Sequence, residues 1–195
     1  MGFLEKGAFV FIHRNSPKRI YLDGAVYFVT FRTSCGFSYF HEEIFCDIFM
    51  ENLKLCKRLK EFKLYAYDLL YEHTHLLLRP GERYDISKIM KSLKENVSCD
   101  INRVMGTNVS ETLAFRLREI GVKKRLDYGK YCKRYLEEYG KGYPEFPPFR
   151  WLRSFHEHVI RNEKDFRNHL RYVMYNHLKH GLPEDWKYTS LNNGL

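Results

Sequence analysis

The stretch KLYAYDLLYEHTHLLL, residues 63–78, decides the fold, because it holds two adjacent strand patterns. Residues 63–71 are rich in aromatic and aliphatic side chains, which favour strands. Residues 73–78 end in three leucines and stop before Arg79-Pro80-Gly81, a sequence that breaks regular structure. The second run is either a separate strand or a continuation of the first strand after a kink. Both interpretations place residues 63–78 in a sheet.

The flanking sequence alternates further strands with amphipathic helices. Residues 25–33 and 149–160 carry β-branched and aromatic side chains and are predicted strands. Residues 41–60, 85–105 and 163–180 place apolar residues at steps of three and four, which predicts helices. Asn162 is suited to cap the last helix, and Gly181 to end it. This order predicts an α+β fold, a ferredoxin-like antiparallel sheet with helices packed on one face.

Residues 106–148 interrupt that order. Residues 111–120 and 126–139 have helical patterns, and 143–148 contain the prolines of a loop. We therefore expect one domain over residues 1–195, with a helical insertion at about 106–148. The role of the insertion is open between DNA contact, contact with a protein partner, and filler.

The charge favours a polyanionic partner. The chain has 33 Lys and Arg against 24 Asp and Glu, a formal net charge of +9. Binding to nucleic acid through such an excess weakens as salt rises. Of the fifteen Tyr and fifteen Phe, most are expected in the core, but some can stack on unpaired bases. The residues expected to form a DNA-binding surface are Lys88, Lys91, Lys94, Arg153, Arg161, Arg167 and Arg171.

The sequence predicts a cytoplasmic protein. Its five cysteines are odd in number and have no C-x-x-C spacing, which indicates reduced thiols and neither a disulfide framework nor a zinc knuckle. No apolar run approaches the length of a membrane span. Glu5 and Lys6 interrupt the apolar residues at the N-terminus, so this segment is not a secretory signal. We expect no membrane partner.

A histidine pair lies in the third predicted strand. Residues i and i+2 of a strand share a face, so His73 and His75 are neighbours with Cα atoms roughly 6.6 Å apart. Two ring nitrogens can hold one divalent cation and leave open positions, which catalysis requires. The alternative is a pair of hydrogen-bonded histidines at a sheet edge.

The last predicted helix carries a tyrosine on a polar seam. His169, Tyr172, Asn176 and His180 fall within roughly 80° of one another around the helix axis. Tyr172 and Asn176 are four residues apart, so their side chains meet; Asn176 can offer a carbonyl oxygen to a cation. Tyr172 can attack a phosphate that the cation polarises, and a covalent phosphotyrosine conserves the bond energy for rejoining. The alternatives are a core tyrosine at 172, or Tyr175 as the nucleophile, about 60° further from the seam.

These motifs resemble the single-tyrosine HUH transposases, and most closely the REP-associated tyrosine transposases. The resemblance is carried by LYEHTHLLL at 70–78, by KSLK at 91–94 with Asn102-Arg103, by RSFHEHVIRN at 153–162 and by YVMYNHLKHGL at 172–182. The sequence departs from the family pattern at Thr74, usually bulky and hydrophobic, and at Tyr71 and His177, where prolines are common. None of these departures removes a ligand or the nucleophile.

The resemblance implies a site and a reaction. His73 and His75 would bind magnesium or manganese, Asn176 would complete the metal site, and Tyr172 would be the nucleophile. The donor chemistry alone leaves zinc open. The implied substrate is single-stranded DNA next to a hairpin, cleaved with a covalent 5′-phosphotyrosine, by a monomer or a homodimer. Two alternatives stand beside this hypothesis: a single-stranded nucleic-acid binding module without catalysis, and a domesticated transposase that processes repeat hairpins.

Overall fold

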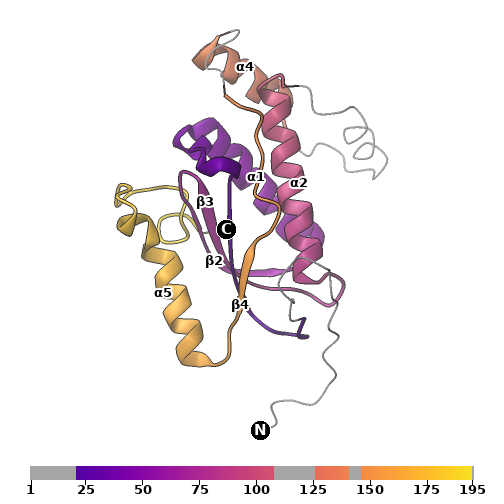
Figure 1. The fold of residues 1–195 in the computed structure, drawn as a ribbon, viewed down its shortest axis with the longest axis vertical. Helices are drawn as coiled ribbons and strands as arrows, with labels where there is room; N and C mark the ends of the chain where they lie inside the picture. Colours follow the sequence, from indigo (N-terminus) through magenta and orange to yellow (C-terminus); the bar gives the residue numbers. More distant parts are fainter. Residues whose placement is uncertain (1–20, 108–125, 141–145, 195) are drawn as a thin grey trace.

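A four-stranded antiparallel sheet in the order β2-β3-β1-β4 is the centre of the structure (Figure 1). The computed structural model describes residues 21–107, 126–140 and 146–194. Two short 3-10 turns, Ser34–Gly36 and Tyr39–His41, precede the first helix. The elements are β1 (Tyr27–Arg32), α1 (Glu43–Lys60), β2 (Lys63–Leu69), β3 (His73–Arg79), α2 (Ile86–Val104), α4 (Tyr128–Tyr139), β4 (His156–Val159) and α5 (Glu163–Lys179).

The predicted fold class is confirmed. β2 and β3 are separate strands joined by a tight turn, in which the Leu70 N–H donates to the carbonyl of His73 at 2.9 Å. β1 lies between β3 and β4 and pairs antiparallel with both. This strand order, with α1 and α2 as the crossovers, is the ferredoxin-like arrangement.

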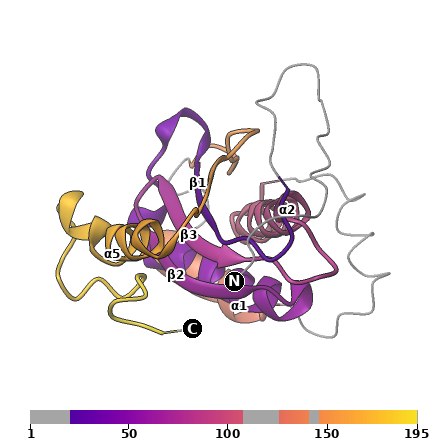
Figure 2. The same ribbon diagram turned by 90° about the horizontal axis from the view of Figure 1, so that it is seen from below.

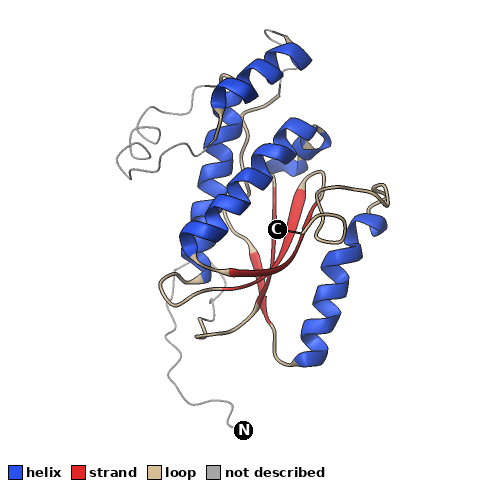
Figure 3. Cartoon of the chain, turned by 180° about the vertical axis from the view of Figure 1, so that it is seen from behind, coloured by secondary structure: helices blue, strands red, loops and turns tan. Residues whose placement is uncertain are grey.

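Helices cover both faces of the sheet, which corrects the expectation that they would pack on one face. α1 and α2 pack against Leu76 and Leu78, whereas α5 packs through Val173 against Ala66 and Leu77. Figures 2 and 3 show α5 on the opposite side of the sheet from α2. The reason lies in β3: successive side chains alternate between faces, so its three consecutive leucines make both faces apolar, and each face needs a cover.

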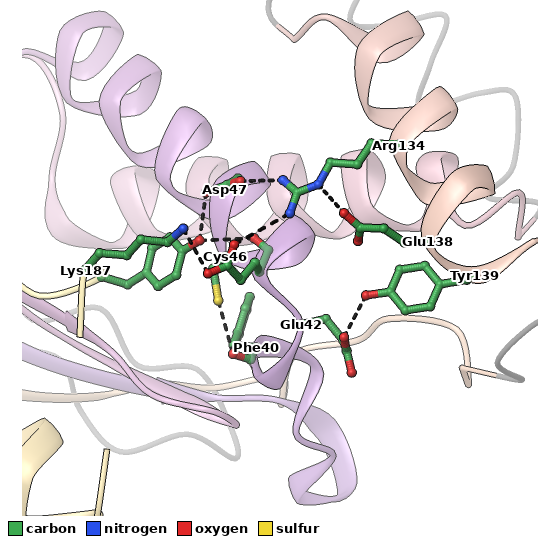
Figure 4. Close-up of polar contacts among 10 residues, drawn as sticks. Phe40, Glu42, Cys46, Asp47, Arg134, Glu138, Tyr139 and Lys187 are labelled. Atoms are coloured by element: carbon green, nitrogen blue, oxygen red, sulfur yellow. Dashed lines mark hydrogen bonds and ion pairs between the residues drawn. The ribbon is translucent and has the colours of Figure 1, made fainter. Parts of the chain in front are cut away.

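α4 confirms the helix predicted at 126–139, while the helix predicted at 111–120 lies outside the described residues. α4 is held to α1 by polar contacts, drawn in Figure 4. Arg134 contacts Asp47 at 2.6 Å, and the Tyr139 hydroxyl donates to Glu42 at 2.7 Å. On its other side Asp47 accepts from the Tyr188 hydroxyl at 2.8 Å, so the first half of α1 is tied to both α4 and the C-terminal segment.

β4 is shorter than the predicted strand at 149–160, because residues 149–151 do not pair along β1 as a continuous ladder. Instead the buried Asn102 side chain on α2 substitutes for a strand partner of Phe149. Its amide nitrogen donates to the Phe149 carbonyl at 2.9 Å, and its oxygen accepts the Phe149 N–H at 2.7 Å. One side chain therefore satisfies both backbone groups of a buried residue.

The C-terminal segment covers the free edge of β2. The Leu69 N–H donates to the Tyr188 carbonyl at 3.0 Å, and the Ser190 N–H donates to the Tyr67 carbonyl at 2.9 Å. Covering an edge strand in this way blocks pairing with other chains. All five cysteines are free thiols. Within the described ranges, no helix combines the length and the apolar character needed to cross a membrane.

Asp68 is a buried acid in β2. Its Cα pairs with that of His75, so the two side chains share the face that α5 covers. Neither carboxyl oxygen has a hydrogen-bond partner among the described residues. Burial raises the pKa of Asp68 to about 8, an effect that the nearby backbone of His177 only partly offsets. The folded protein therefore keeps this carboxyl protonated at neutral pH.

We expect Asn102→Leu to lower the free energy of unfolding by about 2–4 kcal/mol, because two buried backbone groups of Phe149 lose their partner. Urea denaturation measures this loss. Glu95→Ala is the control on the same helix: its half-exposed side chain makes a long ion pair with Lys91, and its effect should stay within about 0.5 kcal/mol. Equal losses in the two variants would contradict the role given to Asn102.

Asp68→Asn tests the buried acid through the pH dependence of stability. The unfolded chain loses this proton near the ordinary aspartate pKa of 3.8, whereas the folded protein keeps it until about pH 8. Between pH 3.8 and about pH 8, folding is therefore coupled to the uptake of one proton by Asp68. As the pH rises through this range, Asp68 lowers the free energy of unfolding by at most about 1.4 kcal/mol per pH unit. Asp68→Asn removes the dependence and should gain stability over wild type from pH 5 to pH 8 in urea denaturation. The exposed Asp23→Asn is the control; parallel curves for wild type and Asp68→Asn would exclude the effect.

Candidate functional site

The two histidines of β3 lie beneath α5 with their ring centroids 5.0 Å apart. Both are buried. His73 Nδ1 contacts Glu72 Oε1 at 2.8 Å, and His75 Nδ1 contacts Thr30 Oγ1 at 2.8 Å. These contacts fix each ring through one nitrogen and leave Nε2 as the atom for a ligand, the usual arrangement of metal-binding histidines.

Both imidazoles are held in the neutral form. Burial lowers the pKa of His75 to about 3, and the neighbouring His73 and His180 contribute to that change. Burial also lowers the pKa of His73, although Glu72 opposes that change. A neutral imidazole has the free lone pair that a metal ion requires. At neutral pH the pair can therefore accept a cation without first losing a proton.

α5 brings Tyr172 against this pair. The Tyr172 ring lies 5.3 Å from the ring of His75 and 5.7 Å from that of Phe28. Asn176, one turn further along the same helix face, is 1% exposed. The structure thus brings Tyr172 onto the histidine pair and buries Asn176 one turn further along the same helix; the roles of these residues stay predictions. Tyr175, the rival nucleophile, is 44% exposed, in contrast to the ring of Tyr172 packed on His75.

The donor set fits one divalent cation. His75 Nε2 and the side-chain nitrogen of Asn176 are buried without hydrogen-bond partners among the described residues. Buried polar atoms are normally satisfied, so such orphan atoms indicate a site that takes a ligand or water. The oxygen and nitrogen of an Asn amide exchange places by a rotation of 180°, so either atom of the Asn176 amide can occupy the unpartnered position. Two imidazoles and one amide oxygen leave the remaining positions for water or a phosphate oxygen.

Sequence reasoning missed the residues that orient the site. Thr30 lies 45 positions before His75, and only the register of β1 with β3 pairs them. Glu72 could have been found as the acid next to His73. His180 was placed on the polar seam without a role, and its ring lies 4.9 Å from that of His73. Lys179 Nζ lies 4.8 Å from the centre of the Tyr172 ring, close enough to meet a phosphate bound there.

The predicted basic residues fall into two groups. Lys88, Lys91 and Lys94 are on α2, and Arg167 and Arg171 are on the exposed side of α5, across the sheet (Figure 2). The α5 group lies on the same helix as Tyr172, and its Arg167 forms an ion pair with Glu163 at 2.8 Å. Arg161 is exposed just before α5.

Lys94 already has a structural task. Its ammonium donates to the carbonyls of Leu152, Arg153 and Ser154 at 2.7, 3.2 and 3.3 Å. These bonds tie α2 to the segment that precedes β4, where the exposed side chain of Arg153 lies. Lys94 is therefore the member of the predicted set least suited to contact phosphate.

Comparisons with known proteins show a similarity to transposases in sequence and in fold. A family model described as "Transposase IS200 like" matches residues 25–114, just under half of the chain. Over 48 residues the chain is 48% identical to a proposed REP-associated tyrosine transposase of Haemophilus influenzae and 40% identical to a REP-associated tyrosine transposase of Escherichia coli. Each match covers 23% of this chain and only 27% and 29% of the respective relative.

A solved structure shares the fold over most of the chain. It is a REP-associated tyrosine transposase bound to a REP hairpin, with a TM-score of 0.59 over 90% of this chain and 82% of its own, at 21% identity. The resemblance indicated by the sequence motifs is thereby confirmed: this chain is similar in sequence to IS200-like transposases over residues 25–114, and it has the fold of a REP-associated tyrosine transposase.

Proposed function

We propose that this chain is a metal-dependent transposase that cleaves and rejoins single-stranded DNA through a covalent 5′-phosphotyrosine on Tyr172. The observation that carries the proposal is the packing of the Tyr172 ring 5.3 Å from His75, whose Nε2 is buried and unpartnered among the described residues. A tyrosine held beside a pair of neutral, oriented imidazoles suits phosphoryl transfer better than it suits a structural core.

In this proposal His73, His75 and Asn176 hold Mg²⁺ or Mn²⁺, which when bound would supply Lewis-acid polarisation of the scissile phosphate. Glu72 and Thr30 keep the two imidazoles oriented. The Tyr172 oxygen attacks phosphorus as the bond from phosphorus to the 3′ oxygen breaks. Tyr172 gives up its phenolic proton and the 3′ oxygen gains one, both by exchange with water. Rejoining reverses the step with another 3′-hydroxyl.

The proposed substrate is single-stranded DNA next to a hairpin. The structural relative is bound to a REP hairpin, and this chain carries Arg167, Arg171 and Lys179 on the helix of the proposed nucleophile. Exposed guanidinium groups there can follow a phosphate backbone toward the site. We further propose one domain with the insertion at about 106–148, acting in the cytoplasm as a monomer or a homodimer.

The binding-module alternative is less well supported. A ferredoxin-like RNA-recognition domain stacks bases on an open sheet face. Here α5 covers that face, and the Phe28 ring is engaged with His75, His169 and Tyr172. A domesticated transposase would have the same site, and inverted repeats in the DNA beside the gene would separate it from a mobile one.

Tyr172→Phe removes only the attacking oxygen and keeps the ring packing against His75. We expect the wild type, incubated with Mn²⁺ and a hairpin-bearing single-stranded oligonucleotide from the gene's flanks, to form an adduct that survives denaturing electrophoresis. Tyr172→Phe should form none while folding and binding DNA normally, and the exposed Tyr175→Phe should behave as wild type. An adduct that persists in Tyr172→Phe and disappears in Tyr175→Phe would reject the assignment.

Arg171→Ala should weaken DNA binding and flatten its salt dependence. For single-stranded DNA, the slope of log K against log salt becomes shallower by about 0.7 for each phosphate that the protein no longer neutralises. Lys94→Met is the matched control: it breaks the bonds to three carbonyls, so it should lower stability and leave the slope unchanged. Fluorescence anisotropy over a salt series measures the slope for both variants, and an unchanged slope for Arg171→Ala would remove Arg171 from the DNA-binding surface.

A further inference from the structure

A second cluster of metal-binding side chains lies where β4 meets α5. One ligand atom from each of His158, Asp165 and His169 lies within 4.8 Å of the other two. His158 Nε2 contacts one oxygen of Asp165 at 2.9 Å, and His169 Nδ1 contacts the other at 3.0 Å. The two rings stack at 4.7 Å with 18° between their planes. Both imidazoles therefore converge on one carboxylate.

This carboxylate is held in place by the backbone. The Arg161 N–H donates to Asp165 Oδ2 at 2.9 Å, and the Asn162 side chain caps the N–H of Asp165 at 2.9 Å. The Arg161 N–H, together with His158, keeps the pKa of Asp165 below its usual value. Asp165 is thus an oriented anion between two imidazoles at the first turn of α5.

The cluster is distinct from the proposed catalytic site. The ring of Phe28 separates the two, contacting His169 at 4.8 Å on one side and His75 at 5.4 Å on the other. Nothing in the proposed cleavage reaction uses His158 or Asp165. The proposed cleavage reaction therefore leaves this cluster without a chemical role.

We propose that His158, Asp165 and His169 bind one zinc-class transition-metal ion that clamps β4 to the first turn of α5. Ligand atoms of a tetrahedral zinc site lie about 3.3 Å apart, so the three ligand atoms, which lie within 4.8 Å of one another, would reach this spacing by small side-chain rotations around the ion. A donor set of two imidazoles and one carboxylate favours zinc over magnesium. The side chains are 34%, 19% and 24% exposed, which leaves water access to a fourth position.

The proposed metal ion would strengthen the attachment of α5 to the sheet at the N-terminal end of the helix. Among described elements, α5 contacts mainly β2 and β3, whereas β4 leads into it through residues 160–162. A metal bridge would add a link between β4 and the N-terminal end of the helix that carries Tyr172. This role is independent of whether Tyr172 cleaves DNA.

Zinc content in a background without the first histidine pair tests the proposal. The full chain carrying His73→Ala and His75→Ala is stripped with chelator, equilibrated with zinc and dialysed, and its metal is measured by elemental mass spectrometry. We expect one zinc per chain, and a rise in Tm with zinc that chelator reverses. Adding His158→Asn and His169→Asn should reduce the zinc to none and abolish the rise. Adding His156→Asn, an exposed histidine of the same strand, should change neither.

Two outcomes would overturn the proposal. One is no zinc in the His73→Ala/His75→Ala protein, which would make the cluster a hydrogen-bonded triad only. The other is zinc retained after His158→Asn and His169→Asn. If that last variant does not fold, anomalous scattering at the zinc edge from crystals of the His73→Ala/His75→Ala protein locates the ion directly. A peak elsewhere, or no peak, also rejects the site.

Discussion

The antiparallel pairing of β1 with β3 sets where every functional side chain of the sheet points. In this register Thr30 lies opposite His75 and bonds to its ring, while Arg32 lies opposite His73. A shift by one residue would turn each side chain to the other face, because strands alternate with a period of two. The two histidines would then enter the core beneath α1 and α2. Each of the leucines at 76–78 would move to the opposite face of the sheet. The site therefore depends on strand register before it depends on any side chain of α5.

The helix of the proposed nucleophile rests on a small apolar contact. Ala66, Leu77 and Val173 form the buried centre, and partly buried residues such as Phe166 and Leu170 surround it. The face under α1 and α2 holds a far larger cluster. An element docked by few buried groups is expected to open more readily than the core. The first turn of α5 is held by polar contacts, namely the Asn162 cap and the contact of His158 with Asp165. These contacts therefore contribute more to the position of α5 than similar contacts would in a helix docked by a large apolar face.

Buried polar atoms gather under α5. His75, Asn176 and Asp68 all carry side-chain atoms there without hydrogen-bond partners, among the described residues. A protein selected for stability alone would replace such groups with apolar ones, since each unsatisfied group costs free energy. The fold accepts this cost on the face where Tyr172 packs, and also on the opposite face, where Thr74 and Asn52 carry buried side-chain oxygens without partners among the described residues.

The sequence by itself determined the helices, the strand order along the chain and the four residues proposed for the site. Helical periodicity and the caps Asp85 and Asn162 are local, so α2 and α5 begin where the sequence predicted. The histidine pair and the seam of Tyr172 and Asn176 are also local, since they depend only on spacings of two and four residues. The predicted strand at 149–160 was too long, because the aromatic residues near 149 serve packing against α2 and Asn102 takes the place of a strand.

Only the tertiary structure decided which helices and strands contact each other and which side chains they bring together. It placed α5 on the second face of the sheet, paired Thr30 with His75, and gathered His158, Asp165 and His169 from a strand and a helix. It also divided the basic residues between two faces and turned Lys94 toward three carbonyls. Spacing along a chain defines directions within one element, whereas the packing of one element on another depends on the sum of many weak contacts.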